Sequence, residues 1–447
     1  MKTHNVTPRS RVHITTKTTS YEGIVLPSRV DDNQDIVVLK LDSGYNVGIL
    51  QKNITKVQEI ASTSSTSPEK QHKNISQNTS LPTIALLHTG GTIASKVDYS
   101  TGGVIADFKP EAILELFPEL SSIANIQSTF LGNMFSDDFR LAHFNTIAKH
   151  VLLAARKGIK KCIVTCGTDF LHYNAAALSF LLHDLPISVL VVGSQRSSDR
   201  GSSDAAMNLI CAAQFLATTD FCGVGICMHE NTDDNTCSIL RGVNARKMHS
   251  SRRDAFKQIN ARPYACVSFE KKTVTLLDTI PTYSSLQKSQ TLKDLPLPDD
   301  FMYFNENLKL GLLYSHPQMW AQEIKAYEGF DGLVIAGSGL GHLPITKNDD
   351  NTKEHEKISQ AIQLLAKTMP VAMSTQTIYG RVHLNVYSPA RKLHSFGVLG
   401  HQSAMTPETT FVKLAWLLST TEPDSISEKF NKNIVGEHDA ISQKDFY

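Results

Sequence analysis

The stretch TIALLHTGGTIAS, residues 83–95, decides the fold of the main part of this chain. A run of apolar and β-branched residues leads straight into Gly90 and Gly91, and a threonine stands on either side of this pair. A short apolar run that stops at glycine is typical of a buried strand in a parallel sheet, and ligands bind beyond the carboxyl ends of such strands. The stretch therefore predicts a strand over 83–87 that is followed by a functional loop.

Downstream of this strand, short apolar strands alternate with helical segments. Strands are predicted at 162–165, 188–192 and 223–227, and helices at 140–157, 174–182 and 204–216. A second series follows, with strands at 308–313, 332–336 and 371–374 and helices at 354–367 and 410–418. This alternation predicts parallel sheets that are covered by helices on both faces.

The domain organisation follows from shifts in composition. Strands rich in Val, Ile and Thr predict a small SH3-like β-barrel over 1–60. The Ser/Thr-rich segment 61–80 has too few bulky apolar residues to order itself and is expected to be a flexible linker. We therefore expect an α/β protein, with its remaining parts assigned as a larger α/β domain over 81–287, an inter-domain linker over 288–307, a smaller α/β domain over 308–420 and a C-terminal tail over 421–447.

Composition excludes several classes of function. The formal net charge is +1, from 44 basic and 43 acidic residues, so the chain as a whole is not a polyanion binder. No apolar run approaches the roughly 20 residues of a membrane span, and the first residues lack the apolar segment of a secretory signal. The seven cysteines show no zinc-ligand spacing. We therefore expect a cytoplasmic protein without a metal site.

The glycine loop after the first strand admits two interpretations. Backbone N–H groups of glycine approach a phosphate or a developing oxyanion equally well. The spacing around Gly90 matches neither a Walker loop nor the GxGxxG of a dinucleotide site, and the later glycine cluster at 337–341 fails the same test. Nucleotide binding is therefore disfavoured, and covalent chemistry on a threonine remains.

Two other segments contain groups that such chemistry needs. In VTCGTD, residues 164–169, a second strand runs into Thr168 and Asp169, although capping of the following helix is the simpler explanation. In NARKMH, residues 244–249, neighbouring positive charges favour a neutral amine on Lys247, although a solvated basic loop explains the pattern as well. Together the segments supply a nucleophile, a carboxylate and a base, but spacing alone does not bring them into contact.

These motifs resemble a known family. TGGTIAS at 89–95 and GTD at 167–169 resemble the two threonine signatures of the bacterial-type L-asparaginases, and Lys247 followed by DAF at 254–256 resembles their lysine segment. Within that family the chain is most similar to the D subunits of archaeal glutamyl-tRNA(Gln) amidotransferases, because of its β-rich extension and of GSQRSSDRGSSDAAMNL at 193–209. The resemblance implies an asparaginase-like two-domain architecture of parallel sheets, preceded by the small barrel.

The resemblance also implies an activity and partners. It implies an amidohydrolase, a glutaminase or asparaginase, that releases ammonia from Gln or Asn without a cofactor of its own. A partner, the E subunit, is expected to bind ATP and Mg and to use the ammonia to convert Glu-tRNA(Gln) to Gln-tRNA(Gln). The expected assembly is a heterodimer, or a heterotetramer formed through self-association of the present chain.

The catalytic residues implied by the resemblance are Thr92, from the first motif, and Thr168, Asp169 and Lys247. In the family Thr92 is the usual nucleophile of the first step, and the other group assists it. Whether Thr92 or Thr168 forms the acyl-enzyme stays open at this point.

The substrate-binding residues implied in the same way are Gly91, Ser136, Asp169 and Tyr99. Ser136 in MFSDDF matches a serine that holds the substrate's α-carboxylate, and Asp169 would bind its α-ammonium group. Tyr99 corresponds to the mobile tyrosine that activates Thr92, with a shorter spacing than in secreted asparaginases.

The chain departs from the family pattern at the second motif, where His-Gly-Thr-Asp-Thr is usual and Cys166 and Phe170 occupy the outer positions. We expect these two replacements to tune the pocket without loss of activity. We do not expect Cys166 to make the chain a cysteine glutaminase, because a matching histidine motif is absent.

Two alternatives for the function stay open: a free-standing L-asparaginase, and a non-enzymatic α/β module whose threonines only cap helices. Five arginines either line a path toward the partner or tRNA or form a solvated surface: Arg196, Arg200, Arg246, Arg252 and Arg253.

Overall fold

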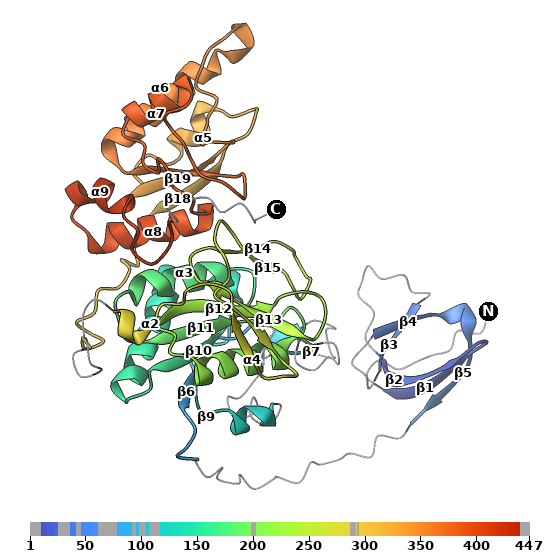
Figure 1. Cartoon of the computed structure of the whole chain (residues 1–447). Coiled ribbons are helices and arrows are strands. Elements are labelled where there is room, and N and C mark those ends of the chain that lie inside the picture. Colours follow the sequence, from blue (N-terminus) through green and yellow to red (C-terminus); the bar gives the residue numbers. More distant parts are fainter. Residues whose placement is uncertain are drawn as a thin grey trace.

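The structure is a computed structural model of the whole chain (Figure 1). It describes residues 10–25, 36–41, 46–60, 78–91, 95–97, 104–106, 117–197, 203–286, 292 and 295–438. Thr92 and Tyr99, two of the residues implied by the asparaginase resemblance, lie outside these ranges, as does most of the linker expected over 61–80.

The N-terminal part is a curved five-stranded antiparallel sheet, drawn in blue in Figure 1. Its strands are β1 (Arg11–Thr16), β2 (Ser20–Val25), β3 (Ile36–Leu41), β4 (Asn46–Leu50) and β5 (Ile54–Glu59), in the order β4-β3-β2-β1-β5. Side chains such as Val12, Ile14 and Leu39 are fully buried in its core, as the alternating pattern of the sequence predicts. The sequence did not predict β5, because ITKVQE has only two apolar residues, and in the structure only Ile54 is buried.

The main sheet has eight strands, and five of them form a parallel core. These are β6 (Thr83–His88), β9 (Asn125–Phe130), β10 (Lys161–Thr165), β11 (Ser188–Val192) and β12 (Gly223–His229), in the order β9-β6-β10-β11-β12. Four of these five were predicted, and β9 was not. Three antiparallel strands that the sequence did not predict extend the sheet beyond β12: β13 (Thr236–Arg241), β16 (Ala265–Ser268) and β17 (Val274–Leu276). The connection over 230–235 is too short for a crossover, so β13 must return antiparallel.

Helices cover both faces of this sheet. On one face lie α2 (Leu141–Arg156) and α3 (Leu171–Leu181), and on the other lies α4 (Ala205–Thr218). All residues of β11 are buried, as expected for a central strand covered on both sides. Gly158 ends α2 with a φ of +92°, the left-handed conformation that glycine adopts without strain.

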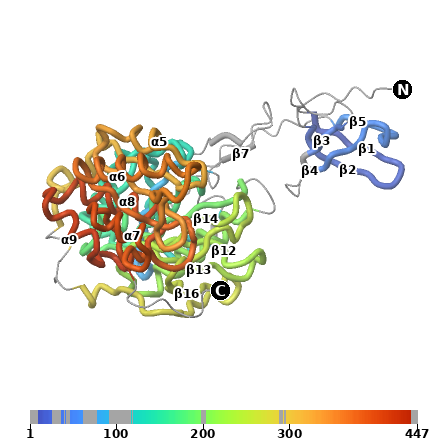
Figure 2. Tube along the Cα trace, turned by 90° about the horizontal axis from the view of Figure 1, so that it is seen from above, coloured from blue at the N-terminus to red at the C-terminus, as the bar shows by residue number. Residues whose placement is uncertain are grey.

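The second domain is a smaller three-stranded parallel sheet of β18 (Leu310–Tyr314), β19 (Gly332–Gly337) and β20 (Val371–Thr375). The helices α5 (Ala321–Lys325), α6 (Glu354–Thr368) and α7 (Ser388–Ser395) enclose an apolar core on one face. On the other face α8 (Pro407–Thr420) lies between this sheet and α3 of the first domain (Figures 1 and 2).

Helix α8 joins the two domains into one packed unit. Phe180 on α3 stacks on Trp416 of α8, with ring centroids 5.6 Å apart. Apolar side chains of both domains, including Val334 of β19, form a single continuous core around these rings. The position of the second domain over the first is therefore fixed by burial of apolar surface.

Described parts of the segments that were expected to be a linker, over 288–307, and a tail, over 421–447, also pack on this unit. Asn145 of α2 donates a hydrogen bond to the Phe304 carbonyl and accepts one from its N–H, both at 2.9 Å. After α9 (Ile426–Phe430), the buried carboxylate of Glu437 forms an ion pair with the buried Lys413 of α8 at 2.6 Å. In the part of the chain that the structure describes, no helix is long and apolar enough to cross a membrane.

Candidate active site

Three loops meet at the carboxyl ends of β9, β6 and β10, which are neighbours in the main sheet. Gly90 and Gly91 follow β6 with φ of +103° and +82°. A Cβ on Gly90 would lie 2.5 Å from the backbone nitrogen of Met134, and one on Gly91 would lie 2.3 Å from that of Gly167. The two glycines therefore let the loops pack backbone against backbone, a role that the sequence alone did not reveal.

We expect Gly91→Ala to destabilise the protein by roughly 3 kcal/mol, because it combines backbone strain with a steric clash. Gly158→Ala is the matched control, since Gly158 has a φ of +92° but no atom within 4 Å of an added Cβ. Urea unfolding of both variants separates strain from clash. Equal losses of the free energy of unfolding would show that the approach of the two loops is not tight.

The second motif and the lysine segment meet at this edge of the sheet. The amine of Lys247 donates hydrogen bonds to Thr168 Oγ1 at 2.9 Å and to Asp169 Oδ1 at 2.8 Å. Thr168 is buried, and the Lys247 side chain is 10% exposed, whereas that of Asp169 is 67% exposed. A hydroxyl, an amine and a carboxylate thus form one cluster that is open to solvent on the Asp169 side, which is an arrangement suited to proton transfer from a threonine hydroxyl.

Lys247 reaches this cluster from a separate two-stranded hairpin. It ends β14 (Ala245–Lys247), which pairs antiparallel with β15 (Phe256–Gln258), and these strands form no ladder with the main sheet. Figure 1 shows the hairpin on the side of the first domain that faces the second.

The simpler interpretation of the second motif, capping of the following helix, is wrong. Helix α3 begins at Leu171, its N-cap residue is Phe170, and no side chain caps that position. Instead, the buried Ser136 on the β9 loop accepts a hydrogen bond at Oγ from the Phe170 N–H at 3.0 Å. The side chains of Thr168 and Asp169 are therefore available to the Lys247 cluster, and Ser136 lies beside it with its own hydroxyl hydrogen free of that bond.

A buried histidine joins the ends of β6 and β10. His88 Nδ1 lies 2.6 Å from Thr165 Oγ1, and Thr89 donates both its N–H and its hydroxyl to the Thr165 carbonyl. Burial lowers the pKa of His88 from 6.5 to about 4, so the ring is neutral near pH 7. These contacts hold the two motif-bearing strands in register at the site.

We expect this histidine to make folding pH-dependent. Because the His88 pKa is lower in the folded chain than in the unfolded chain, its stabilising effect is complete above about pH 6.5 and is lost as the pH falls toward 4. The loss for this group is about 3 kcal/mol. Urea unfolding at pH 7.5 and pH 5 captures about 2 kcal/mol of this loss, and His88→Asn should show a shallower dependence. An unchanged dependence in His88→Asn would contradict the assignment.

Cys166 stands next to the second motif but is not positioned as a nucleophile. Its side chain is fully buried, and burial raises the pKa of its thiol to about 12. The thiol is therefore protonated at neutral pH, and only the thiolate is a strong nucleophile. Among the described residues no group of His, Cys, Asp and Glu side chains is arranged to hold a metal ion.

The positive charges of the arginines around Lys247 are compensated by carboxylates in ion pairs. Arg246 forms an ion pair with Glu408 at 3.1 Å. Arg252 pairs with Asp254 at 2.6 Å, and Arg253 pairs with Asp234. These arginines therefore do not provide the uncompensated positive charge that the sequence suggested beside Lys247, and Arg200 lies outside the described residues.

Family models match most of the chain. The model described as "Asparaginase, N-terminal" matches residues 83–281, the "Glutaminase/Asparaginase C-terminal domain" matches 309–430, and the "GatD N-terminal domain" matches 6–60. Among solved structures, the thermostable L-asparaginase from Thermococcus kodakarensis superposes with a TM-score of 0.67 at 26% identity, covering 80% of this chain and 100% of that chain. A probable cytoplasmic L-asparaginase from Campylobacter jejuni, at 24% identity and a TM-score of 0.63, shares the fold over 79% of this chain and 100% of its own.

Related sequences align with nearly the whole chain, including its N-terminal part. The D subunit of the glutamyl-tRNA(Gln) amidotransferase from Pyrococcus furiosus is 41% identical, over 90% of this chain and 86% of its own length. The D subunits from Methanococcus maripaludis strain C5 and Archaeoglobus fulgidus are each 37% identical, over 95% and 97% of this chain and 96% of their own lengths. The cluster of Thr168, Asp169 and Lys247 thus lies in an asparaginase fold that carries the N-terminal domain of these relatives, and the chain belongs to the family of glutamyl-tRNA(Gln) amidotransferase D subunits.

Proposed function

We propose that this chain is the ammonia-releasing component of a tRNA-dependent amidotransferase, which hydrolyses the side-chain amide of glutamine or asparagine through a threonine acyl-enzyme. The observation that supports this most strongly is the contact of the Lys247 amine with Thr168 Oγ1 at 2.9 Å and with Asp169 Oδ1 at 2.8 Å. A threonine hydroxyl is a weak nucleophile until a base removes its proton, and a lysine in its neutral form at this distance is such a base.

In the proposed reaction a threonine hydroxyl attacks the amide carbon of the donor. The hydroxyl proton passes to the neutral Lys247 amine and from there to the leaving nitrogen, so that ammonia departs and an ester remains on the threonine. Water then hydrolyses this ester and releases glutamate or aspartate. We assign the first attack to Thr92, assisted by Thr168, Asp169 and Lys247, with backbone N–H groups around Gly91 stabilising the oxyanion.

The geometry suits the binding of an amino-acid donor. Ser136 Oγ accepts the Phe170 N–H, which leaves its hydroxyl hydrogen for the donor's α-carboxylate. Asp169 uses Oδ1 for Lys247, and the exposed remainder of its carboxylate is free for the donor's α-ammonium group. We assign Tyr99 to activation of the first threonine.

The proposed partner is the E subunit of the amidotransferase, which would bind ATP and Mg and consume the ammonia on Glu-tRNA(Gln) in the cytoplasm. We propose a heterodimer that forms a heterotetramer through self-association of the present chain, with no cofactor in the chain itself. Membership of a family of amidotransferase subunits and the N-terminal domain match over 6–60 support a partner-dependent enzyme. A free-standing L-asparaginase is the second candidate, supported by the superposition on the Thermococcus kodakarensis enzyme.

Ammonia release separates these functions. We expect the purified chain to release ammonia from glutamine or asparagine, and the rate to rise strongly when the E subunit and Glu-tRNA(Gln) are both added. A rate that does not respond to either addition would favour a free-standing asparaginase. No ammonia under any condition would contradict both candidates, and co-purification of the two proteins provides the independent check on the partner.

A further inference from the structure

Lys247 stands on a hairpin that, within the described residues, forms no ladder with the main sheet and is joined to it by side-chain contacts, such as the hydrogen bond from the Arg241 N–H to Gln258 Oε1 at 2.8 Å. The β14–β15 hairpin is held by its own ladder of three residue pairs, from Ala245 opposite Gln258 to Lys247 opposite Phe256. A two-stranded hairpin is only marginally stable by itself, so contacts from outside must fix the position of Lys247.

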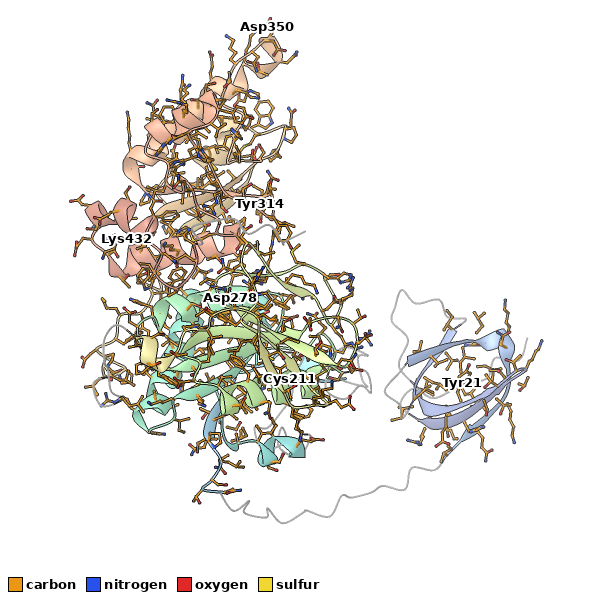
Figure 3. The ribbon with its side chains drawn as sticks, viewed as in Figure 1. Tyr21, Cys211, Asp278, Tyr314, Asp350 and Lys432 are labelled. Atoms are coloured by element: carbon orange, nitrogen blue, oxygen red, sulfur yellow. The ribbon has the colours of Figure 1, made fainter. Side chains whose placement is uncertain are left out.

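The second domain supplies such contacts through the first turn of α8. Thr409 Oγ1 donates a buried hydrogen bond to the Val243 carbonyl at 2.8 Å, just before β14 begins. Next to it, Glu408 Oε1 pairs with Arg246 Nη2 at 3.1 Å, and the same guanidinium nitrogen lies 3.5 Å from Tyr314 Oη. Figure 3 shows Tyr314 on the side of the second domain that faces the first.

The ion pair is buried on its acidic side. The Glu408 side chain is 8% exposed and that of Arg246 is 21% exposed. The second carboxylate oxygen, Oε2, is buried and has no hydrogen-bond partner within the described structure. A buried carboxylate is costly unless a cation compensates it, so Glu408 strongly favours the one backbone arrangement that brings Arg246 to it.

Arg246 and Lys247 are consecutive residues of one strand, so their side chains point to opposite faces. Arg246 points to α8 of the second domain, while Lys247 reaches Thr168 and Asp169 of the first. We propose that Glu408 and Arg246 form an interdomain clamp that positions the Lys247 amine at Thr168. Glu408 and Arg246 are thus positioning residues that act through Lys247, and this inference rests on the proposed amidohydrolase function.

Kinetics of clamp variants test the proposal in the full chain with its partner protein. Displacing a catalytic group by about 1 Å costs roughly a hundredfold in rate, so we expect Glu408→Gln and Arg246→Met each to lower kcat by about that factor. The donor's KM should change little, because the donor contacts proposed above, at Ser136 and Asp169, involve neither Glu408 nor Arg246. The double variant should be no slower than the slower single variant, and Arg246→Lys should recover much of the rate, because it keeps a positive charge for Glu408.

Glu428→Gln is the matched control, because Glu428 on α9 forms an exposed ion pair with Lys432 in the same domain. It should keep the wild-type kcat. Thermal unfolding of each variant gives the folded fraction at the assay temperature. An unchanged kcat in Glu408→Gln, losses that multiply in the double variant, or a kcat loss equal to the loss of folded protein would each overturn the clamp.

Amide hydrogen exchange provides a readout that does not depend on activity. We expect exchange over 244–247 to accelerate in Glu408→Gln and Arg246→Met but not in Glu428→Gln. If the wild-type chain releases no ammonia, the proposed function fails while this measurement still decides whether the clamp exists. Unchanged exchange over 244–247 would overturn the clamp even in an active enzyme.

Discussion

Replacing Lys247 with methionine should lower ammonia release from glutamine or asparagine about 10³-fold, the typical contribution of a positioned acid–base group. Methionine keeps an unbranched side chain of similar length, so it fills the space of the largely buried Lys247 side chain, which is 10% exposed. We therefore expect the packing of the hairpin to survive. What is lost is the amine that contacts Thr168 Oγ1. The measurement is kcat for ammonia release, with thermal unfolding to confirm that the variant is folded.

Lys257→Met is the control for this experiment. Lys257 lies on β15 of the same hairpin, and its amine contacts the Glu230 carbonyl and Asp254 instead of the catalytic cluster. We expect this variant to keep the wild-type kcat. Wild-type activity in Lys247→Met would remove the lysine from the mechanism, whereas equal losses in both variants would indicate general damage to the hairpin.

Removal of the Thr168 hydroxyl should have a comparable effect. Thr168→Val keeps the methyl group, which lies against Gly193, but removes the hydroxyl that Lys247 contacts. We expect a loss of about 10³-fold in kcat, while Thr168→Ser keeps measurable activity because its hydroxyl remains. The combination with Lys247→Met should be no slower than the slower single variant, because the two groups act as a unit.

Full amidase activity in Thr168→Val would exclude the second motif from the chemistry. Mass spectrometry of acid-quenched enzyme after mixing with glutamine provides the complementary test, because the trapped acyl group marks the attacking threonine. An acylated peptide that contains Thr92 supports the assignment made above. An acylated peptide that contains Thr168 would exchange the roles of the two threonines.

Much of the sheet could be predicted from local sequence because its strands are short, apolar and bounded by glycine or polar residues. The predicted strand over 188–192 coincides with β11, and the predicted stop of α2 at Gly158 is confirmed by its φ of +92°. The antiparallel strands after β12 were missed, because β13, β16 and β17 gain their partners from the edge of the completed sheet. Local periodicity does not contain that information.

The candidate site was likewise predicted only in part from the sequence. Motif spacing singled out Thr168, Asp169 and Lys247, but it also allowed Thr168 and Asp169 to cap α3, which the contact between Ser136 and Phe170 excludes. No local signal pointed to Glu408 as a partner of the site, because a glutamate after a proline is typical of any helix N-terminus.

The sequence by itself determined which reactive groups this protein carries and that two of its motifs follow strands, because strand ends and glycine loops are local properties of the chain. Only the tertiary structure decided that Lys247, which is 79 residues from Thr168, lies 2.9 Å from its hydroxyl, and that Glu408 of the second domain holds the neighbouring Arg246. Such contacts depend on the order of strands in the sheet and on the shared core around α8. Burial of apolar surface fixes that arrangement over the whole chain at once, so no single stretch of sequence specifies it.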